Sequence, residues 1–271
     1  MIRRRIKQIA LLSLAVLAVF FLHDRVRKEA ELAPGEKTSP DAEENASDMD
    51  ATQSMSVLRM GEGMTLGQIE ANPDGEGIRI VRTTENGAEE TLVFTDVALD
   101  SWYASAVNFV VSAGLMTGVR DKDAFQPEYG IQRENFAAIL YRFTNGETIE
   151  PASRFEDVPE DSWYYDAVNW AVSQRLMSGL TPTTFGVGEF MTCEQALICL
   201  YRVAGRPETD GTLTDYPYAA KVTDSGRKAV DWAWKSGLIT ENECVWYPPQ
   251  AISRAQVALL LTRFSSMSSG G

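Results

Sequence analysis

Residues 94–119, FTDVALDSWYASAVNFVVSAGLMTGV, decide the fold, because they return at residues 155–180 as FEDVPEDSWYYDAVNWAVSQRLMSGL. Without a gap, the two copies agree at 15 of 26 positions, which chance does not produce. A third, degenerate copy covers residues 216–240, where KAVDWAWKSGLIT corresponds to DAVNWAVSQRLMS of the second copy. Self-similarity at a period of about 60 residues indicates a tandem array of one structural unit.

Each unit is predicted to be a helix, a loop and a second helix. Asp100 or Ser101 is the expected N-cap of the first helix, and Gly114 is its expected end. Its apolar residues recur at the spacing of one buried helical face. They are Trp102, Ala106, Phe109, Val110 and Ala113.

The second helix of each unit comes from the closing stretches GIQRENFAAILYRF, FMTCEQALICLYRV and AISRAQVALLLTRF. Thr192 with Gln195, and Ser253 with Gln256, fit the capping box that begins a helix. Gln132 with Asn135 is a weaker version. A turn that carries one aromatic residue lies between the two helices of each unit. It is built around Phe125, Phe185 and Trp246.

Two helices per unit cannot bury their apolar faces alone, so the units are expected to pack on one another. The predicted fold is all-α, with three helix-loop-helix repeats packed as a pseudo-trimeric bundle behind a small β-hairpin region and a disordered acidic linker. The expected parts are a signal peptide or membrane anchor (1–28), the acidic linker (29–56), a β-hairpin stalk (57–93), and repeats at 94–150, 151–210 and 211–267.

The N-terminus has the order of an export signal. Basic residues precede an uncharged, mostly apolar run over residues 9–22, which is shorter than the roughly 20 residues of a comfortable membrane span. No small-x-small cleavage site follows the run. A cleaved signal and an uncleaved anchor both remain open, and the missing cleavage site favours the anchor. Either one predicts an extracellular protein of the cell surface.

Residues 29–56 and 57–93 differ in composition. The first segment is acidic and lacks core-forming residues, which is typical of a disordered, extended linker. The second contains IRIVRTTENGAEETLVF, and Asn86-Gly87 between two β-branched runs predicts a β-hairpin. Residues 56–60 are a candidate third strand. The expected role of this segment is a stalk or a cap on the first repeat.

Charge and chemistry exclude several classes of function. Residues 1–28 hold seven Lys or Arg and one acidic residue, so the rest of the chain carries 18 basic and 37 acidic residues. A body that acidic is repelled by phosphate backbones, and we expect no nucleic-acid partner. His23 is the one histidine, and no CxxC pair occurs among the three cysteines. The sequence therefore predicts no enzyme, no metal site and no cofactor.

The combined motif F-x-D-V, S-W-Y-x-x-A-V, G-L-M-x-G, F-x-P and I-x-R-E-x-F-A-x-I-L-x-R resembles the S-layer homology domain. The resemblance covers residues 94 to about 265. It implies a pseudo-trimer of three repeats around a central three-helix bundle. It also implies non-covalent attachment to the bacterial cell wall, through grooves that bind secondary cell-wall polysaccharide, often with pyruvylated sugars.

The family's binding residues carry over unevenly. Tyr218 stands at the third-copy position of the family's aspartate, and Cys193 stands at the second-copy position of its arginine. Gly226 lies near the place of the tryptophan in the third copy. Only the first copy keeps Asp, Trp and Arg together. The ligand-binding residues that the resemblance implies are Asp96, Trp102, Arg133, Glu134, Asp157, Trp163, Glu194 and Arg254.

Arg133 and Arg254 also stand out without the family, because each is the first residue of a predicted helix. A cation there opposes the helix dipole, so an anionic group is expected opposite each one. That group is a salt-bridge partner, Asp96 or Asp157, or a ligand carboxylate held by the arginine fork. The tryptophans are either core residues or partly exposed sugar platforms. Cys193 is a thiol of depressed pKa or, as we interpret it, a degenerate arginine position.

Three functions are compatible with the sequence. The favoured one is a wall-binding module on a membrane or secreted stalk, with secondary cell-wall polysaccharide or a peptidoglycan-linked polymer as its partner. The second is a degenerate array that acts as a structural spacer or protein-interaction module. The third is a remnant subunit of a wall enzyme whose catalytic partner is another chain.

Overall fold

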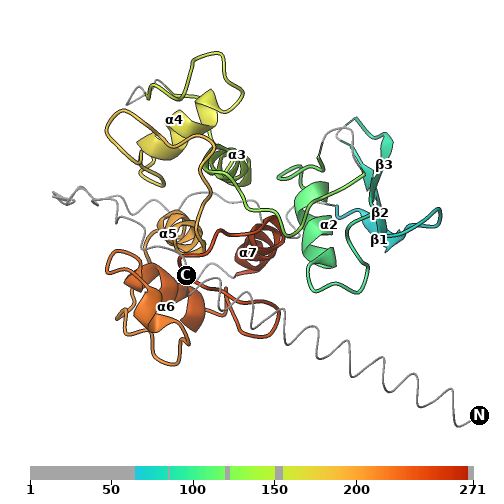
Figure 1. Cartoon of the computed structure of the whole chain (residues 1–271). Helices are drawn as coiled ribbons and strands as arrows, with labels where there is room; N and C mark the ends of the chain where they lie inside the picture. Colours follow the sequence, from blue (N-terminus) through green and yellow to red (C-terminus); the bar gives the residue numbers. More distant parts are fainter. Residues whose placement is uncertain (1–64, 85, 120–122, 150–154, 268–271) are drawn as a thin grey trace, which may run out of the picture. The chain divides into compact units, whose positions relative to one another are not determined.

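The computed structural model describes residues 65–84, 86–119, 123–149 and 155–267 (Figure 1). The chain divides into two units, Met1–Asp48 and Met49–Gly271, and all described residues belong to the second unit. The predictions of a signal or anchor, of the acidic linker and of a strand at residues 56–60 lie outside the described residues. Within the described ranges, no helix combines the length and the apolar character that a membrane crossing needs.

The described elements are three strands followed by helices. The strands are β1 (Gln68–Ala71), β2 (Ile78–Thr83) and β3 (Glu89–Phe94), and the helices are α2 (Ala104–Ser112), α3 (Arg133–Phe143), α4 (Tyr165–Ser173), α5 (Cys193–Val203), a short 3-10 helix η1 (Ala219–Lys221), α6 (Arg227–Lys235) and α7 (Arg254–Ser266). The described chain is thus helical with a small β-sheet in front, as predicted.

The predicted hairpin is present and belongs to a three-stranded antiparallel sheet of order β1-β2-β3. Thr84 N donates to the Ala88 carbonyl over 2.8 Å across the turn. Gly87 adopts a φ of 81°, a left-handed conformation that glycine reaches without strain. The third strand of the sheet is β1.

The sheet covers helix α2. Ile78 and Ile80 on β2 are fully buried and belong to the same apolar cluster as the helices. The buried Asn108 on α2 donates its amide to the Gly67 carbonyl over 2.8 Å, and Gly67 N donates to Ser112 Oγ over 2.9 Å. Because a buried amide is costly without partners, these bonds fix the chain before β1 to the helix.

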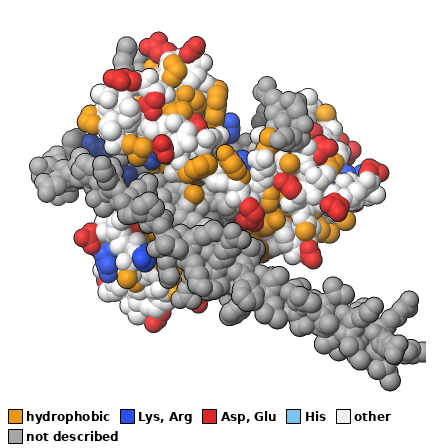
Figure 2. Space-filling model, in the orientation of Figure 1, with side chains coloured by type: hydrophobic (Ala, Val, Ile, Leu, Met, Phe, Trp, Pro, Cys, Tyr) orange, Lys and Arg blue, Asp and Glu red, His pale blue; other side chains and the backbone are white. Residues whose placement is uncertain are grey.

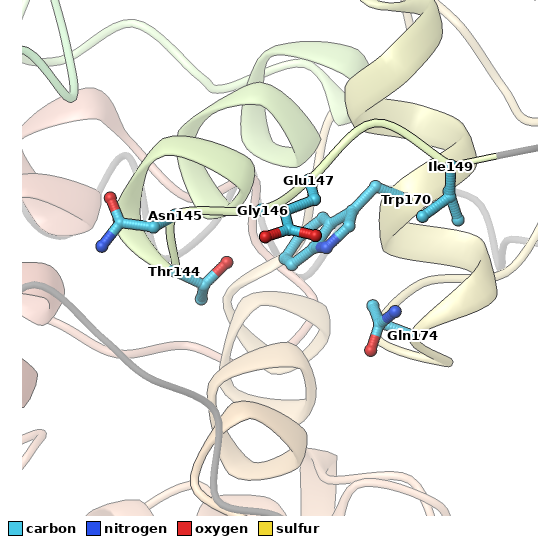
Figure 3. Close-up of a pocket in the computed structure, with 7 residues that line it drawn as sticks. All are labelled: Thr144, Asn145, Gly146, Glu147, Ile149, Trp170 and Gln174. Carbon is cyan, nitrogen blue, oxygen red and sulfur yellow. The ribbon is translucent and has the colours of Figure 1, made fainter.

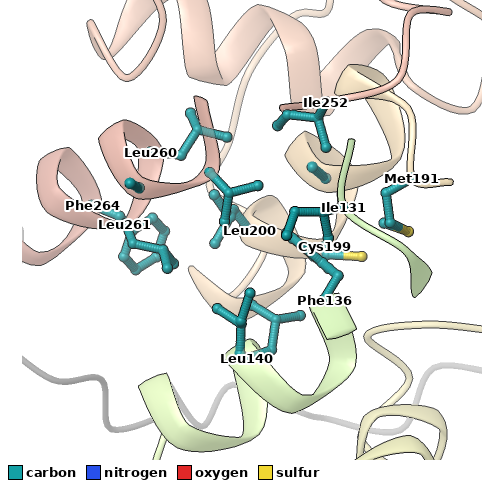
Figure 4. Packing of buried hydrophobic residues seen from close by; sticks show 14 of the residues in the cluster. Ile131, Phe136, Leu140, Met191, Cys199, Leu200, Ile252, Leu260, Leu261 and Phe264 are labelled. Carbon is teal, nitrogen blue, oxygen red and sulfur yellow. The ribbon is translucent and has the colours of Figure 1, made fainter. Parts of the chain in front are cut away.

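The first helix of each repeat contacts the second helix of another repeat. The contacts join α3 with α4, α5 with α6, and α7 with α2. Side chains from α3, α5 and α7 meet in one apolar cluster, which includes Leu140, Leu200 and Leu261 (Figure 4). The three repeats therefore share a core instead of each having one of its own.

Within a repeat, an arginine near the end of the second helix ties the two helices together. Arg142, Arg202 and Arg263 each donate Nη1 to the carbonyl of a leucine just beyond the first helix, over 3.3, 3.1 and 3.2 Å. The acceptors are Leu115, Leu176 and Leu238. The same bond in all three repeats shows that the third copy, despite its degenerate sequence, folds like the other two.

The helix starts confirm some of the predicted caps and correct others. Both capping boxes, Thr192 with Gln195 and Ser253 with Gln256, are present, whereas Gln132 makes no side-chain cap bond. The prediction that Asp100 or Ser101 caps α2 is wrong. The N-cap is Tyr103, because Ala104 N first closes a turn onto the Ser101 carbonyl over 3.2 Å. Gly114 does end the helix, with a φ of 67°.

Candidate functional site

Six of the eight predicted binding residues, all but the two tryptophans, lie where one repeat meets the next. We name each place by two repeats: first the repeat whose second helix begins there, and then the neighbouring repeat that this helix start contacts. The three places are junction 3–1, junction 1–2 and junction 2–3. The backbone N–H groups of Arg254, Arg133 and Cys193 donate to carbonyls of a neighbouring repeat over 2.9, 2.9 and 2.8 Å. Isolated antiparallel bridges, Gly130 with Ser253, Gln132 with Phe190 and Thr192 with Ala251, connect the segments just before the second helices.

In junction 1–2, Arg133 reaches from α3 into the second repeat. Its Nε donates to the Phe185 carbonyl over 2.9 Å, and its Nη2 donates to the Ser178 carbonyl over 2.6 Å. The guanidinium carbon lies 4.8 Å from the centroid of the Phe185 ring, within cation–π range. Arg133 is only 5% exposed, so the two carbonyls and the ring replace most of the water around its charge.

Junction 3–1 repeats this geometry with Arg254 on α7. Its Nε donates to the Phe125 carbonyl over 2.7 Å and its Nη2 to the Thr117 carbonyl over 2.6 Å. The guanidinium carbon lies 4.6 Å from the centroid of the Phe125 ring. Burial lowers the pKa of Arg254, while the negative charge of Asp96 acts in the opposite direction. Two equivalent arginine sites are thus built from different repeats.

Asp96 and Asp157 hold the aromatic turns. The carboxylate of Asp96 accepts the N–H groups of Phe125 and Gln126 over 2.8 and 2.7 Å. Asp157 accepts those of Phe185, Gly186 and Val187 over 2.8, 2.7 and 2.9 Å. Burial opposes ionisation of Asp157, but the backbone bonds outweigh it and hold its pKa below the usual range.

These turns adopt a backbone conformation that the aspartates stabilise. Gln126 has a φ of 56° and Gly186 a φ of 91°, both in the left-handed region. A Cβ at residue 186 would lie 2.4 Å from Leu180 Cδ1 and 3.2 Å from Arg133 Nε. Glycine at this position therefore leaves the space that Arg133 occupies.

The structure corrects the grouping that the sequence predicted. Arg133 meets the turn held by Asp157 of the second repeat, and Arg254 meets the turn held by Asp96 of the first. Two junctions, rather than the first copy alone, combine an arginine with an aspartate. In the described part of the chain, no ion pair joins these arginines to Asp96 or Asp157, so the salt-bridge alternative is wrong. Backbone carbonyls are their partners instead.

The two predicted glutamates also bind the neighbouring repeat. Glu134, 5% exposed, accepts Gly188 N on Oε2 over 3.0 Å. Glu194, 7% exposed, accepts Thr223 N on Oε2 over 3.0 Å and the Thr223 hydroxyl on Oε1. Ala255 has this position in the third copy, and its N–H donates to the Pro127 carbonyl. These contacts make both glutamates supports of the junctions.

The two tryptophans differ in exposure. Trp163 is 63% exposed, while Trp102 is half-buried against the core. Each makes an edge-to-face contact with the next residue, Tyr103 or Tyr164. Because Tyr103, Tyr164 and Gly226 are equivalent N-caps, the third-copy residue at the tryptophan position is Ser225, one residue before the predicted Gly226. A partly exposed ring is confirmed for Trp163.

Junction 2–3 has no arginine and is built differently. Tyr216, at the position of Phe94 and Phe155, donates its hydroxyl to the Trp246 carbonyl. That carbonyl corresponds to the acceptors of the arginine Nε in the other junctions. Burial raises the pKa of Tyr216, so the hydroxyl keeps its proton. Burial also raises the pKa of the Cys193 thiol to about 12, which rules out a depressed pKa.

Sequence reasoning missed the role of Tyr216. The signal was the joint change of three residues, with Tyr for Phe at residue 216, Trp for Phe at residue 246 and Cys for Arg at residue 193. The hydroxyl of Tyr216 supplies the donor that the missing arginine would have provided. At the aspartate position, Tyr218 makes a ring contact with Tyr247, with centroids 5.3 Å apart.

Cys193→Arg is therefore expected to destabilise the protein, although it restores the family residue. Cys193 is 1% exposed, and the acceptor that an arginine Nε would use already binds Tyr216. Forcing a larger side chain into a packed site typically costs about 1–3 kcal/mol. Chemical denaturation would measure the loss. The double variant with Tyr216→Phe frees the acceptor and should recover part of the stability. An unchanged midpoint for Cys193→Arg would show that the junction has room for the guanidinium.

A pocket outside the predicted residues lies between the end of α3 and α4. It is lined by Thr144, Asn145, Gly146, Glu147, Ile149, Trp170 and Gln174 (Figure 3). Trp170 is only 4% exposed, and its ring contacts Tyr141 edge-to-face at 5.5 Å. The indole is thus part of the core, and the pocket contains none of the junction residues.

Comparisons with known proteins agree with the repeats seen in the sequence. The model of the S-layer homology domain matches residues 93–137 and 154–197, which lie in the first two repeats. Residues 93–137 and 154–197 therefore match the S-layer homology domain, as the resemblance implied.

The relatives include surface proteins and a glycosidase. The chain is 29% identical over 170 residues to the surface-layer 125 kDa protein of Lysinibacillus sphaericus, covering 60% of this chain and 14% of the relative. It is 30% identical over 149 residues to a cell surface protein of Thermoanaerobacter kivui, covering 52% and 18%. It is 22% identical over 178 residues to an exoglucanase of Acetivibrio thermocellus, covering 64% and 16%. The chain thus matches less than a fifth of the length of each of these relatives.

Proposed function

We propose that this chain attaches non-covalently to the bacterial cell wall by binding an acidic wall polysaccharide at junctions 3–1 and 1–2. A pyruvylated secondary cell-wall polymer fits this chemistry, because its carboxylates would meet the two arginines. The role is non-catalytic, and its place is the cell surface. The likeness to S-layer homology domains and to surface proteins supports the general role.

The observation that carries the proposal is the preorganised arginine. Each guanidinium is fixed at a helix start by two carbonyls and an aromatic ring. Nη1 of Arg133 faces only a weak acceptor at close range among its described contacts, the Met191 sulfur at 3.9 Å. A carboxylate arriving there gains a charge-assisted hydrogen bond without the cost of ordering a long side chain.

The acidic surface makes local positive sites necessary for binding an acidic polymer. Acidic side chains are spread over the face in Figure 2, and basic ones gather in few places. An acidic polymer is repelled by such a surface as a whole, so it needs local positive sites. Junction 2–3 offers Cys193 and Tyr218 in place of the arginine and the aspartate. We infer that junction 2–3 does not bind a carboxylate, so each chain has two carboxylate-binding sites.

We further propose that the three repeats form a closed pseudo-trimer. The contact between α7 and α2 joins the last repeat to the first, and the bridges before the second helices connect all three. Closure supports the function because junction 3–1 exists only if the third repeat returns to the first. In this proposal residues 1–28 tether the chain to the membrane.

Binding to purified cell-wall sacculi of the host bacterium tests the function. The full chain is expected to sediment with intact sacculi. It should remain largely in the supernatant with sacculi whose secondary polymer has been removed by acid extraction. Equal sedimentation with both preparations would point to another wall component. No sedimentation with either would favour the alternative, a degenerate array that acts as a spacer or protein-interaction module.

A further inference from the structure

Two aromatic side chains are exposed just before the second helices. Tyr129 is 52% and Phe190 44% exposed, although both belong to otherwise ordered turns. Their rings meet edge-to-face, with centroids 5.7 Å apart and an interplanar angle of 76°. We call Tyr129 and Phe190 the aromatic pair. The contacts that form the junctions do not require these two rings to be exposed.

The aromatic pair is held on a rigid backbone. Tyr129 donates its N–H to the Gln126 carbonyl over 3.1 Å and accepts Arg254 N over 2.9 Å. Phe190 lies in the bridge with Gln132. A Cβ at Gly130 would lie 2.8 Å from Phe190 Cδ1, so the ring rests against the backbone of residue 130. The pair is therefore preorganised, and binding would cost little side-chain entropy.

The size of the pair decides what it fits. Aromatic side chains present roughly 150–250 Å² each, so the exposed halves together offer on the order of 200 Å². A stable protein interface buries about 800 Å² on each partner, which is several times more. A single sugar ring, whose C–H groups can lie against an aromatic ring while its hydroxyls face water, matches the available area.

The charges around the pair decide what kind of sugar fits. Glu128 and Glu189, both exposed, flank the two aromatic residues in sequence. Carboxylates accept hydrogen bonds from sugar hydroxyls or ammonium groups and repel acidic groups. We propose that the aromatic pair binds one pyranose ring of a neutral or amino sugar.

This site differs from the arginine sites in its chemistry, since it needs no anionic group on the ligand. Its backbone links it to both of them. Tyr129 O accepts Arg254 N, and Glu189 O accepts Arg133 N. The pair thus lies between junction 3–1 and junction 1–2 along the connected turns. Neutral sugar units of a polymer that spans both junctions would pass over it.

Saturation-transfer NMR on the full chain tests the proposal with three neutral probes, chitotetraose, mannotetraose and maltotetraose, and with tetragalacturonate as the acidic probe. At least one neutral probe is expected to bind saturably, and Phe190→Ala should weaken it about tenfold, the effect typical of losing a stacking partner. Phe190→Trp should keep the binding. Because the neutral probes carry no carboxylate, their result is independent of the wall-binding result with sacculi.

Two further variants separate stacking from folding. Gly130→Ala should weaken binding of the same probe, because the added Cβ pushes the Phe190 ring aside while both aromatic residues remain. Leu99→Ala, at a 47% exposed apolar residue, should leave it unchanged. All variants must melt like the wild type. Failure of all three neutral probes to bind, or undiminished binding by Phe190→Ala, would overturn the proposal.

Discussion

Replacing Arg133 with alanine is expected to lower the free energy of unfolding by about 3 kcal/mol or more, because a buried acceptor that loses its donor typically costs about 1–3 kcal/mol. Two acceptors lose their donors, the carbonyls of Phe185 and Ser178. The Phe185 ring also loses the guanidinium packed against it. Urea denaturation followed by far-UV circular dichroism would measure the change.

Arg142→Ala is the matched control. Arg142 lies on the same helix and also donates to a carbonyl, that of Leu115, but it is exposed. Water can replace its hydrogen bond, so the loss should stay within roughly 1 kcal/mol. Equal effects of the two substitutions would mean that Arg133 does not hold the junction together.

Removing residues 211–271 is expected to abolish cooperative folding of the whole described body, not to trim one repeat from it. The deletion takes away α7, the helix that packs against α2 of the first repeat. Phe264 on α7 contacts Phe143 on α3, with ring centroids 5.8 Å apart, and that contact also disappears. Because each repeat buries its apolar face against another, the remaining two have no complete core.

Thermal unfolding of the shortened chain would measure this, and the expected trace has no sharp transition. Adding the separate fragment 211–271 should restore part of the helical signal, because the lost contacts are non-covalent. A sharp transition of the shortened chain alone would show that the repeats fold independently, and the closed pseudo-trimer would then be wrong.

Local patterns in the sequence predicted the local structure well. The repeat, the capping boxes and the Asn86-Gly87 hairpin depend on residues close in the chain, where spacing and turn chemistry act directly. The failed N-cap at Asp100 or Ser101 has a local cause too. Those residues form a turn before the helix, and sequence alone does not distinguish that turn from the first turn of a helix.

The grouping of the binding residues could not be predicted from spacing. Arg254 binds the carbonyls of Phe125 and Thr117, which are 129 and 137 residues away in the chain. Copies of a repeat show which residues are equivalent, but they do not show which copy contacts which. Tyr216 was missed for the same reason. The role of its hydroxyl as a replacement for the arginine donor can be recognised only once Cys193 is known to face the third repeat.

Sedimentation with intact sacculi, compared between the wild type and a double variant that carries Arg133→Lys and Arg254→Lys, tests whether the two arginine junctions hold the wall polymer. Lysine keeps the charge but loses the planar fork, so the double variant is expected to bind at least tenfold more weakly. Arg142→Lys, outside the junctions, is the control and should bind like the wild type. Both variants must first be shown to be folded at the temperature of the binding assay, by far-UV circular dichroism and a cooperative melt above that temperature. Undiminished binding of a folded double variant would contradict the claim that the two arginine junctions hold the wall polymer.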